Sequence, residues 1–212
     1  MLVRHDRVRW RLPAKKRGTP GSPSGRLRIV AGKWRSRLLP VADADGLRPT
    51  PERVRETLFN WLAPVIEGAH CLDLFAGSGA LGLEALSRGA ADAVFVENAP
   101  IAVAALRQNI ETLGATGARI VETDAFEWLR AADPSPFDIV LLDPPFAAGR
   151  YEELCRLLSD RGWLAEKALV YIEQERDQPA LALPEGWRVK KEKAAGNVRY
   201  SLVEAVNGGN SR

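Results

Sequence analysis

Cysteine is scarce in this sequence, because the 212 residues hold only Cys71 and Cys155. The two are far apart and lack the short spacing of metal ligands, so we expect buried thiols in a reducing compartment, with no disulfide framework and no metal site. Long apolar runs are missing as well, since no stretch approaches the ~20 residues that cross a bilayer. The first thirty residues also lack the apolar segment of a secretory signal. These absences predict a cytoplasmic protein without a membrane partner.

Acidic residues are nearly missing from the first part of the chain. Residues 1–37 hold twelve Lys or Arg and a single acid, Asp6, so this segment carries +11 while the whole chain carries +3. A basic arm on an acidic remainder is typical of proteins that bind nucleic acid, because cations that contact phosphates release counterions. For residues 1–24 alone, a solvated tail is the alternative. The hydrophobic content of 46% fits one globular core, and we expect a monomer because no large exposed apolar stripe is evident.

Linker-like composition at both ends defines the expected domain organisation. Residues 1–25 are rich in Gly, Ser and Pro and predict a disordered basic extension, and residues 207–212 predict a disordered tail. Residues 26–206 predict a single domain. Within it, residues 26–66 form a small basic hairpin and a helix, and residues 67–206 form an α/β core.

The expected elements follow from apolar periodicity and turn residues. Strands are predicted at 27–31, 38–41, 70–75, 92–97, 118–122, 137–142, 168–173, 187–193 and 198–206. Helices are predicted at 51–63, capped by Thr50, and at 79–88, 100–113, 124–131 and 150–159. Strands that alternate with helices indicate a doubly wound, mostly parallel sheet, and the short link at 194–197 makes the last two strands an antiparallel hairpin. This is the Rossmann-like arrangement of class I methyltransferases.

A glycine-rich turn follows the first strand of the core. Gly77, Gly79 and Gly82 have the G-x-G-x-x-G spacing, which by itself would equally suit a dinucleotide. Asp73, inside the strand, discriminates, because a carboxylate repels a diphosphate and attracts the ammonium and sulfonium groups of S-adenosylmethionine. The residues predicted to hold this cofactor in the turn are Asp73, Phe75, Ala76, Gly77, Ser78 and Gly79.

Two further acids follow the next two strands of the core. Glu97 closes the second strand, where its carboxylate can accept both ribose hydroxyls, and Asn98 comes next. Asp124 follows the third strand, with Ala125 and Phe126 placed to contact the adenine through an amide and an apolar surface. The alternatives are a surface residue at a strand end for Glu97 and a helix cap for Asp124. The cofactor prediction therefore depends on the three acids together.

The fourth strand of the core ends in Asp143-Pro144-Pro145-Phe146. Two successive prolines fix the backbone and remove two N–H donors, so the Pro144 carbonyl is presented as an acceptor. An aromatic amine is a poor nucleophile, but acceptance of its hydrogens by Asp143 and Pro144 lets the nitrogen attack a sulfonium methyl in line. Phe146 is expected to stack on a base that has left its own stack. The alternative is a strand-ending turn with an aromatic plug.

These segments closely resemble the bacterial 16S ribosomal RNA guanine(966)-N2 methyltransferases. The shared motifs are Arg28 to Gly32, Gly46 to Thr50, Arg53 to Leu62, Asp73 to Leu86 and Asp143 to Phe146, and the similarity spans Arg26 to Glu204. The resemblance implies transfer of a methyl group to the N2 amine of a flipped guanine in 16S rRNA, on the small subunit or its assembly intermediate. It also implies that Arg48 and Thr50 border the cofactor or target pocket. One departure is Asn98-Ala99, where relatives often carry a second acid.

The predicted RNA-binding residues are Arg28, Lys33, Arg35, Arg37 and Arg48. Other functions remain open on the motifs alone. An adenine-N6 methyltransferase of DNA or RNA uses the same acceptors, although no separate target-recognition domain is visible. A non-catalytic RNA-binding assembly factor would need neither Asp73 nor Asp143. A nicotinamide oxidoreductase fits the glycine spacing but lacks a hydride-transfer constellation.

Overall fold

The structure is a computed structural model that describes residues 25–41, 50–144 and 150–206. Residues 1–24 of the predicted extension, the predicted tail and three predicted site residues, Arg48, Pro145 and Phe146, lie outside the described residues. Gly25, predicted as the last residue of the extension, is instead the first residue of a strand. No helix within the described ranges is long and apolar enough to span a membrane. In the same ranges, no group of three or more metal-ligating side chains comes together.

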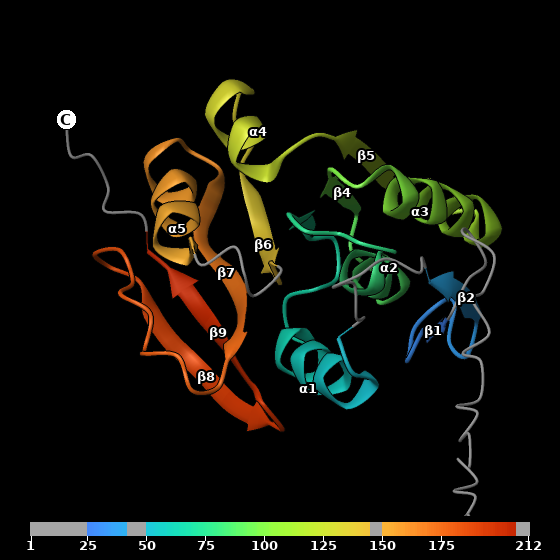
Figure 1. Ribbon diagram of the computed structural model, residues 1–212, viewed down its shortest axis with the longest axis horizontal. Coiled ribbons are helices and arrows are strands. Elements are labelled where there is room, and N and C mark those ends of the chain that lie inside the picture. Colours follow the sequence, from blue (N-terminus) through green and yellow to red (C-terminus); the bar gives the residue numbers. More distant parts are fainter. Residues whose placement is uncertain (1–24, 42–49, 145–149, 207–212) are drawn as a thin grey trace, which may run out of the picture.

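A seven-stranded sheet forms the centre of the molecule (Figure 1). Its strands are β3 (His70–Asp73), β4 (Asp92–Glu97), β5 (Ala118–Glu122), β6 (Phe137–Leu142), β7 (Leu164–Glu175), β8 (Arg188–Ala195) and β9 (Val198–Ala205). Their order across the sheet is β5-β4-β3-β6-β7-β9-β8. The strands from β3 to β7 are parallel, and β9 runs antiparallel to both neighbours, β7 and β8. The predicted α/β fold with an antiparallel C-terminal pair is thus confirmed.

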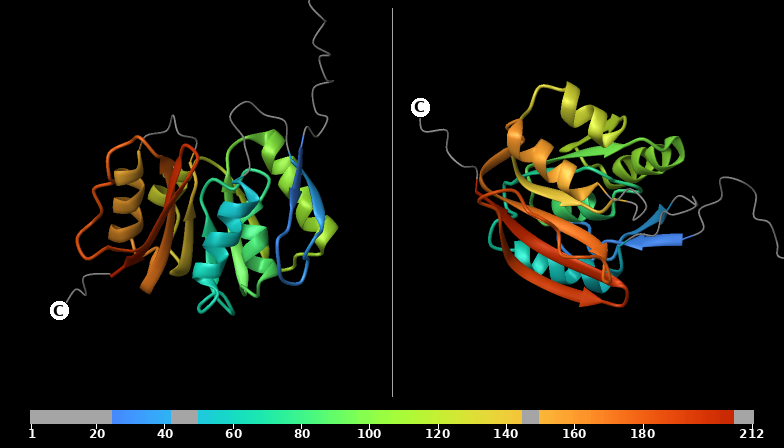
Figure 2. Two further views of the ribbon diagram at one scale, coloured as in Figure 1. Left: turned by 90° about the horizontal axis from the view of Figure 1, so that it is seen from below. Right: turned by 60° about the vertical axis from the view of Figure 1, so that its left-hand side comes forward.

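Helices cover both faces of this sheet (Figure 2). They are α1 (Glu52–Leu62), α2 (Ala80–Ser87), α3 (Pro100–Leu113), α4 (Ala125–Ala131) and α5 (Tyr151–Asp160). One core contains buried side chains of α1, α2 and α3, such as Leu58, Leu83 and Leu106. A second core contains Leu129 of α4 and Leu154 of α5. Because parallel strands are covered on both faces, the inner strands are apolar along almost their whole length.

A separate two-stranded sheet packs against α2. Strands β1 (Gly25–Arg28) and β2 (Leu38–Val41) pair antiparallel, which confirms the predicted hairpin. Strand β1 ends earlier than expected because the amides of Val30 and Ala31 donate to the carboxylate of Glu84 at 2.8 and 3.0 Å instead of continuing the hairpin. Gly32 follows with a φ of 81°, and a Cβ there would lie 1.8 Å from the carbonyl oxygen of Ser87. Only glycine therefore fits where the hairpin turn meets the end of α2.

The start of α1 differs from the sequence prediction. The helix begins at Glu52, its N-cap residue is Pro51, and no side chain caps it. The prediction that Thr50 caps this helix is wrong, because the Thr50 hydroxyl donates a hydrogen bond to a distant carboxylate instead.

Candidate active site

Three acidic residues lie where strands β3, β4 and β6 end. Asp73 is the last residue of β3, Glu97 is the last of β4, and Asp143 directly follows β6. Asp73 pairs in register with Phe95 of β4 and Leu141 of β6, so the three carboxylates share the carboxyl edge of the sheet. Open α/β sheets bind their ligands at this edge. The structure therefore brings together the acids that the sequence placed at separate strand ends.

Asp73 is the most deeply buried of the three, with 2% of its surface exposed. Its carboxylate accepts a hydrogen bond from the Gly82 amide at 3.0 Å. The pKa of Asp73 is raised to about 7, chiefly by burial and also by the nearby carboxylates of Asp143 and Glu97, while the amide hydrogen bonds lower it. Among the described groups that act on this pKa, none is a Lys or Arg. A cationic ligand at this edge would therefore be attracted and would restore the charge of Asp73.

The glycine-rich turn is held by contacts within the protein. The Ala76 amide donates to the Val96 carbonyl at 3.1 Å, and Gly79 has a φ of 87°. A Cβ on Gly79 would lie 2.6 Å from a methyl carbon of Leu106, and one on Gly82 would lie 2.3 Å from the Phe95 ring. These two glycines are required by packing inside the fold. The close approach of backbone to a ligand stays a prediction for Gly77.

Glu97 accepts three backbone hydrogen bonds. One carboxylate oxygen accepts from the Gly77 amide at 2.7 Å, and the other accepts from Asn98 and Ala99 at 3.0 and 2.8 Å. An ionised carboxylate offers about four lone-pair sites. Glu97 thus fixes the turn to the end of β4 and keeps acceptor capacity for about one more donor. Its predicted contact with the two ribose hydroxyls stays a prediction.

Asp124 is the N-cap of α4. Its carboxylate oxygen Oδ1 accepts from the amides of Phe126 and Glu127 at 2.9 and 3.0 Å, so the helix-cap alternative is confirmed. Phe126 packs edge-on against Phe75, with ring centroids 6.5 Å apart. The guanidinium carbon of Arg150 lies 3.8 Å from the Phe126 centroid and covers one face of that ring. Contact of the adenine with Asp124, Ala125 and Phe126 stays a prediction.

Asp143 is the predicted acceptor for the substrate amine. The Thr50 hydroxyl donates to its Oδ2 atom at 2.8 Å, and both Thr50 and Pro144 are buried. Burial raises the pKa of Asp143 to about 6, while the Thr50 hydrogen bond lowers it. The hydroxyl therefore holds the orientation of the carboxylate and favours its charged form.

Glu173 of β7 is a buried acid that the motifs did not indicate. Leu142 of β6 pairs in register with Ile172 of β7. The residues that follow them, Asp143 and Glu173, therefore lie side by side. The Tyr171 hydroxyl donates to the Glu173 carboxylate at 2.7 Å. Burial, and then the charge of Asp143, raise the pKa of Glu173 to about 7. An acid that directly follows the apolar run 168–172 was the available signal, and it is the same kind of signal that drew attention to Asp73.

The turn of the N-terminal hairpin lies toward the amino ends of the parallel strands, whereas Asp143 lies at their carboxyl ends. The Lys33 amide donates to the carbonyl of Ser87, the last residue of α2. The Arg37 guanidinium donates to the carbonyl of Thr112 in the last turn of α3. Both helices begin near the carboxyl edge and run back across the sheet. These two predicted RNA-binding residues therefore lie away from Asp143, and their contact with RNA stays a prediction.

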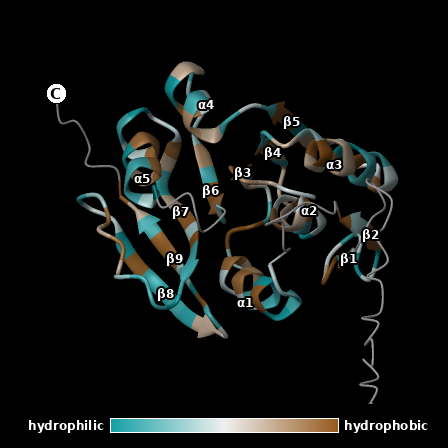
Figure 3. Ribbon diagram, viewed as in Figure 1, coloured by the Kyte–Doolittle hydropathy of each residue, from teal (hydrophilic) through white to brown (hydrophobic). Residues whose placement is uncertain are grey.

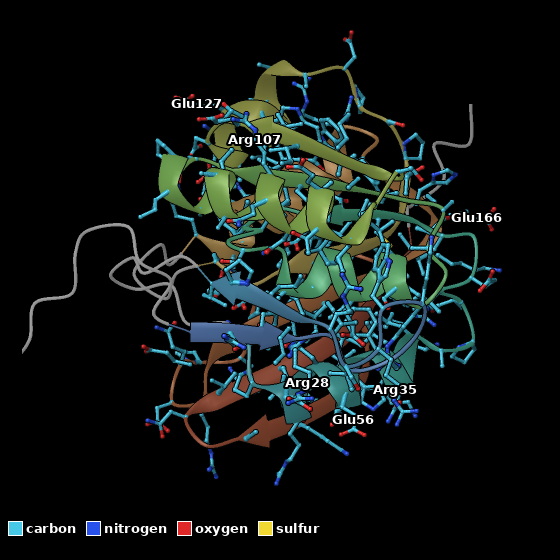
Figure 4. The ribbon with its side chains drawn as sticks, turned by 90° about the vertical axis from the view of Figure 1, so that its right-hand side faces the viewer. Arg28, Arg35, Glu56, Arg107, Glu127 and Glu166 are labelled. Atoms are coloured by element: carbon cyan, nitrogen blue, oxygen red, sulfur yellow. The ribbon has the colours of Figure 1, made fainter. Side chains whose placement is uncertain are left out.

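The two other described residues that were predicted to bind RNA are Arg28 and Arg35. Figure 4 shows both on the hairpin side of the molecule, and both are exposed. Arg28 lies nearer to the site, because its guanidinium is 3.9 Å from Glu52 at the start of α1. An exposed ion pair of this length contributes little to stability, and contact of Arg28 with RNA stays a prediction.

Comparisons with known proteins give a consistent picture. Residues 27–204 match the family model described as conserved hypothetical protein 95. The chain is 52% identical over 190 residues to ribosomal RNA small subunit methyltransferase D of Escherichia coli, with 90% of this chain and 96% of the relative covered. The protein of the same name from Haemophilus influenzae is 45% identical, with 90% and 99% covered. The solved structure of Escherichia coli yhhF matches with a TM-score of 0.81 and 49% identity, covering 86% of this chain and 99% of that one.

Proposed function

The chain belongs to the family described as conserved hypothetical protein 95, and on that premise we propose that it methylates small-subunit ribosomal RNA from S-adenosylmethionine. The finer proposal is that the acceptor is the exocyclic N2 amine of one guanine in 16S rRNA. The observation that carries it is the Asp143 carboxylate, held by Thr50 at the same sheet edge as Asp73 and Glu97.

The methyl donor fits the charges of this edge. S-adenosylmethionine carries an ammonium and a sulfonium, and the acids Asp73, Glu97 and Asp143 make the described part of this edge attractive to cations. Asp73 would bind near the ammonium, while Glu97 and the Phe75–Phe126 pair would hold the adenosine. Bound donor supplies an electrophilic methyl group that an amine nitrogen attacks in line.

Asp143 would accept one hydrogen of the substrate amine, and the Pro144 carbonyl would accept the other. The nitrogen lone pair then leaves conjugation with the ring and forms a bond to the methyl carbon as the carbon–sulfur bond breaks. The sulfur keeps the bonding electrons, and the nitrogen passes a proton to Asp143. A carboxyl whose pKa is raised by burial is a suitable acceptor for that proton.

The second carboxylate favours guanine over adenine. In guanine the ring nitrogen beside the exocyclic amine carries a hydrogen, whereas in adenine it carries a lone pair. Glu173 adds an acceptor next to Asp143, so the two carboxylates would match the two adjacent donors of guanine when both are ionised. The position of that guanine in the RNA follows from the resemblance of the sequence motifs.

Labelled methyl transfer tests this function. The full chain is incubated with S-adenosylmethionine bearing a labelled methyl, and with small subunits, free 16S rRNA or duplex DNA. We expect label in the rRNA of the subunits and, after digestion, in N2-methylguanosine. Label in N6-methyladenosine would refute the guanine assignment, and label in duplex DNA alone would refute rRNA as the substrate.

The Asp143→Ala variant is the matched negative control for that assay. Donor binding by the variant, measured by calorimetry, should persist, because Asp73 and Glu97 are unchanged. Methyl transfer that survives within a few-fold would show that Asp143 does not accept the amine hydrogen.

A further inference from the structure

Strand β8 is unusually basic for a part of the central sheet. It reads Arg-Val-Lys-Lys-Glu-Lys-Ala-Ala, with four cations and one acid, and every residue before Ala195 is exposed. The strand forms one border of the sheet, and Figure 3 shows it hydrophilic along most of its length. The sequence motifs did not single out this strand.

Two lysines of β8 lie on the face of the sheet that α1 covers. After a register shift between Val189 and Lys191, Lys191 pairs with Leu202, and Lys193 pairs with Tyr200. Leu202 and Tyr200 belong to the core beneath α1, and residues paired in register point to the same face. Lys191 and Lys193 therefore extend that face beyond the buried core.

Lys193 also lies in the same cross-strand row of residues as Asp143, the proposed acceptor. Tyr200 pairs with Lys193 on one side and with Glu173 on the other, and Glu173 lies beside Asp143. The row crosses three strand spacings, each about 4.8 Å, so Lys193 is about 14 Å from the strand that carries Asp143. Trp61 of α1, which is half-buried, packs on Tyr200 at 5.5 Å between centroids and borders the row.

The charge of this strand is only partly balanced. Lys190 pairs with Glu204 at 3.2 Å, and Glu192 accepts a hydrogen bond from Ser201. Within the described ranges, Lys191 and Lys193 form no ion pair. Two solvated ammonium groups at this distance from the target base suit the phosphates of an RNA strand.

We propose that Lys191 and Lys193, on the exposed face of β8, form a second RNA-binding surface that holds phosphates next to the methylated nucleotide. The proposal rests on the proposed function, because it takes ribosomal RNA as the partner. The hairpin turn contacts the opposite side of the fold, so the two basic surfaces would bind separate parts of the RNA.

Lysines on the outermost, or edge, strand of a sheet can also have a protective role, because they prevent pairing with the edge strand of another molecule. Two double variants separate the two roles. Lys191→Gln/Lys193→Gln removes the charge, and Lys191→Glu/Lys193→Glu reverses it while the edge strand stays charged. The matched control is Arg161→Glu/Lys167→Glu, which reverses two exposed cations around the end of α5 and the start of β7, at the amino ends of the parallel strands and away from Asp143.

Binding to a fluorescent fragment of 16S rRNA is measured by anisotropy over a range of KCl concentrations, without the methyl donor. We expect the Gln variant to lower the slope of log Kd against log salt by about 1.4–1.8, which corresponds to two phosphate contacts. The Glu variant should bind more weakly still, and the Arg161/Lys167 control should match the unmodified protein.

Unchanged slopes in both double variants would overturn the proposal. If the Gln variant alone then self-associates in size-exclusion chromatography, the lysines serve to protect the edge strand. Weaker action on small subunits with unchanged affinity for free RNA would assign the surface to a ribosomal protein and would also overturn it. Methyl transfer by the unmodified protein is measured in parallel, so a failure of the proposed function is recognised separately.

Discussion

The hydrogen bond from Thr50 to Asp143 gives the sharpest prediction, which is a change in the pH dependence of methyl transfer. Thr50→Val keeps the shape of the side chain and removes the hydroxyl that donates to Asp143 at 2.8 Å. A hydrogen bond to a charged group contributes about 1.5–3 kcal/mol. Because Asp143 is partly exposed, we use the lower value, which raises its pKa by about one pH unit, from about 6 to about 7.

The sign follows from the form of Asp143 that works. Only the ionised carboxylate accepts the amine hydrogen, so the rate falls as pH drops through the pKa. Raising the pKa from about 6 to about 7 lowers the ionised fraction about fivefold at pH 6 and hardly at all at pH 8. We expect single-turnover methyl transfer to rise with pH along a curve displaced upward by about one unit.

Two controls keep this result interpretable. Thr50→Ser restores the hydroxyl and should restore the pH profile. Thr57→Val removes a hydroxyl from α1 that bonds only the Arg53 carbonyl, one turn earlier in the same helix, and should leave the profile unchanged. A rate that is reduced equally at pH 6 and pH 8 would refute the reasoning, because a general structural defect has no such pH dependence.

Three further predictions concern stability, each measured by urea unfolding. Since burial raises the pKa of Asp73 to about 7, the ligand-free protein should lose stability as pH rises from 5 to 8, and Asp73→Asn should reduce that loss; an equal loss would contradict it. Gly82→Ala places a Cβ 2.3 Å from Phe95 and should cost about 1–3 kcal/mol, with partial rescue by Phe95→Leu. Glu84→Gln leaves the buried Arg55 without its partner and should cost about 3–5 kcal/mol; a cost below about 1 kcal/mol would show that the pair is unimportant.

Local sequence signals determined most element boundaries. The helix predicted at 100–113 is α3 with the same ends, because Pro100 begins it and Gly114 ends it in the left-handed region. The strand predicted at 92–97 is β4, since its apolar run is continuous. Strand β7 extends beyond its predicted 168–173 at both ends, where polar residues at 166–167 and 174–175 concealed it.

The site could be predicted where an acidic residue follows an apolar strand. It could not be predicted where a contact joins residues that are distant in the sequence. Asp73, Glu97 and Asp143 each follow an apolar strand, so the sheet topology alone brings them together. The bond from Thr50 to Asp143 spans 93 residues, and the local rule for helix caps pointed elsewhere. Charge counts likewise indicated a basic hairpin, but only the packing on α2 shows that its turn lies away from the site.

The burial of Glu84 also bears on the order in which the chain acquires its structure during synthesis. Glu84 is fully buried, accepts the amides of Val30 and Ala31, and pairs with Arg55 and Arg88. A two-stranded hairpin has little stability of its own. Residues 25–41 leave the ribosome before α2 does, and the carboxylate that fixes them follows 54 residues after Val30. The hairpin therefore docks only once α2 has been translated, so its place in the fold is determined by a later part of the chain.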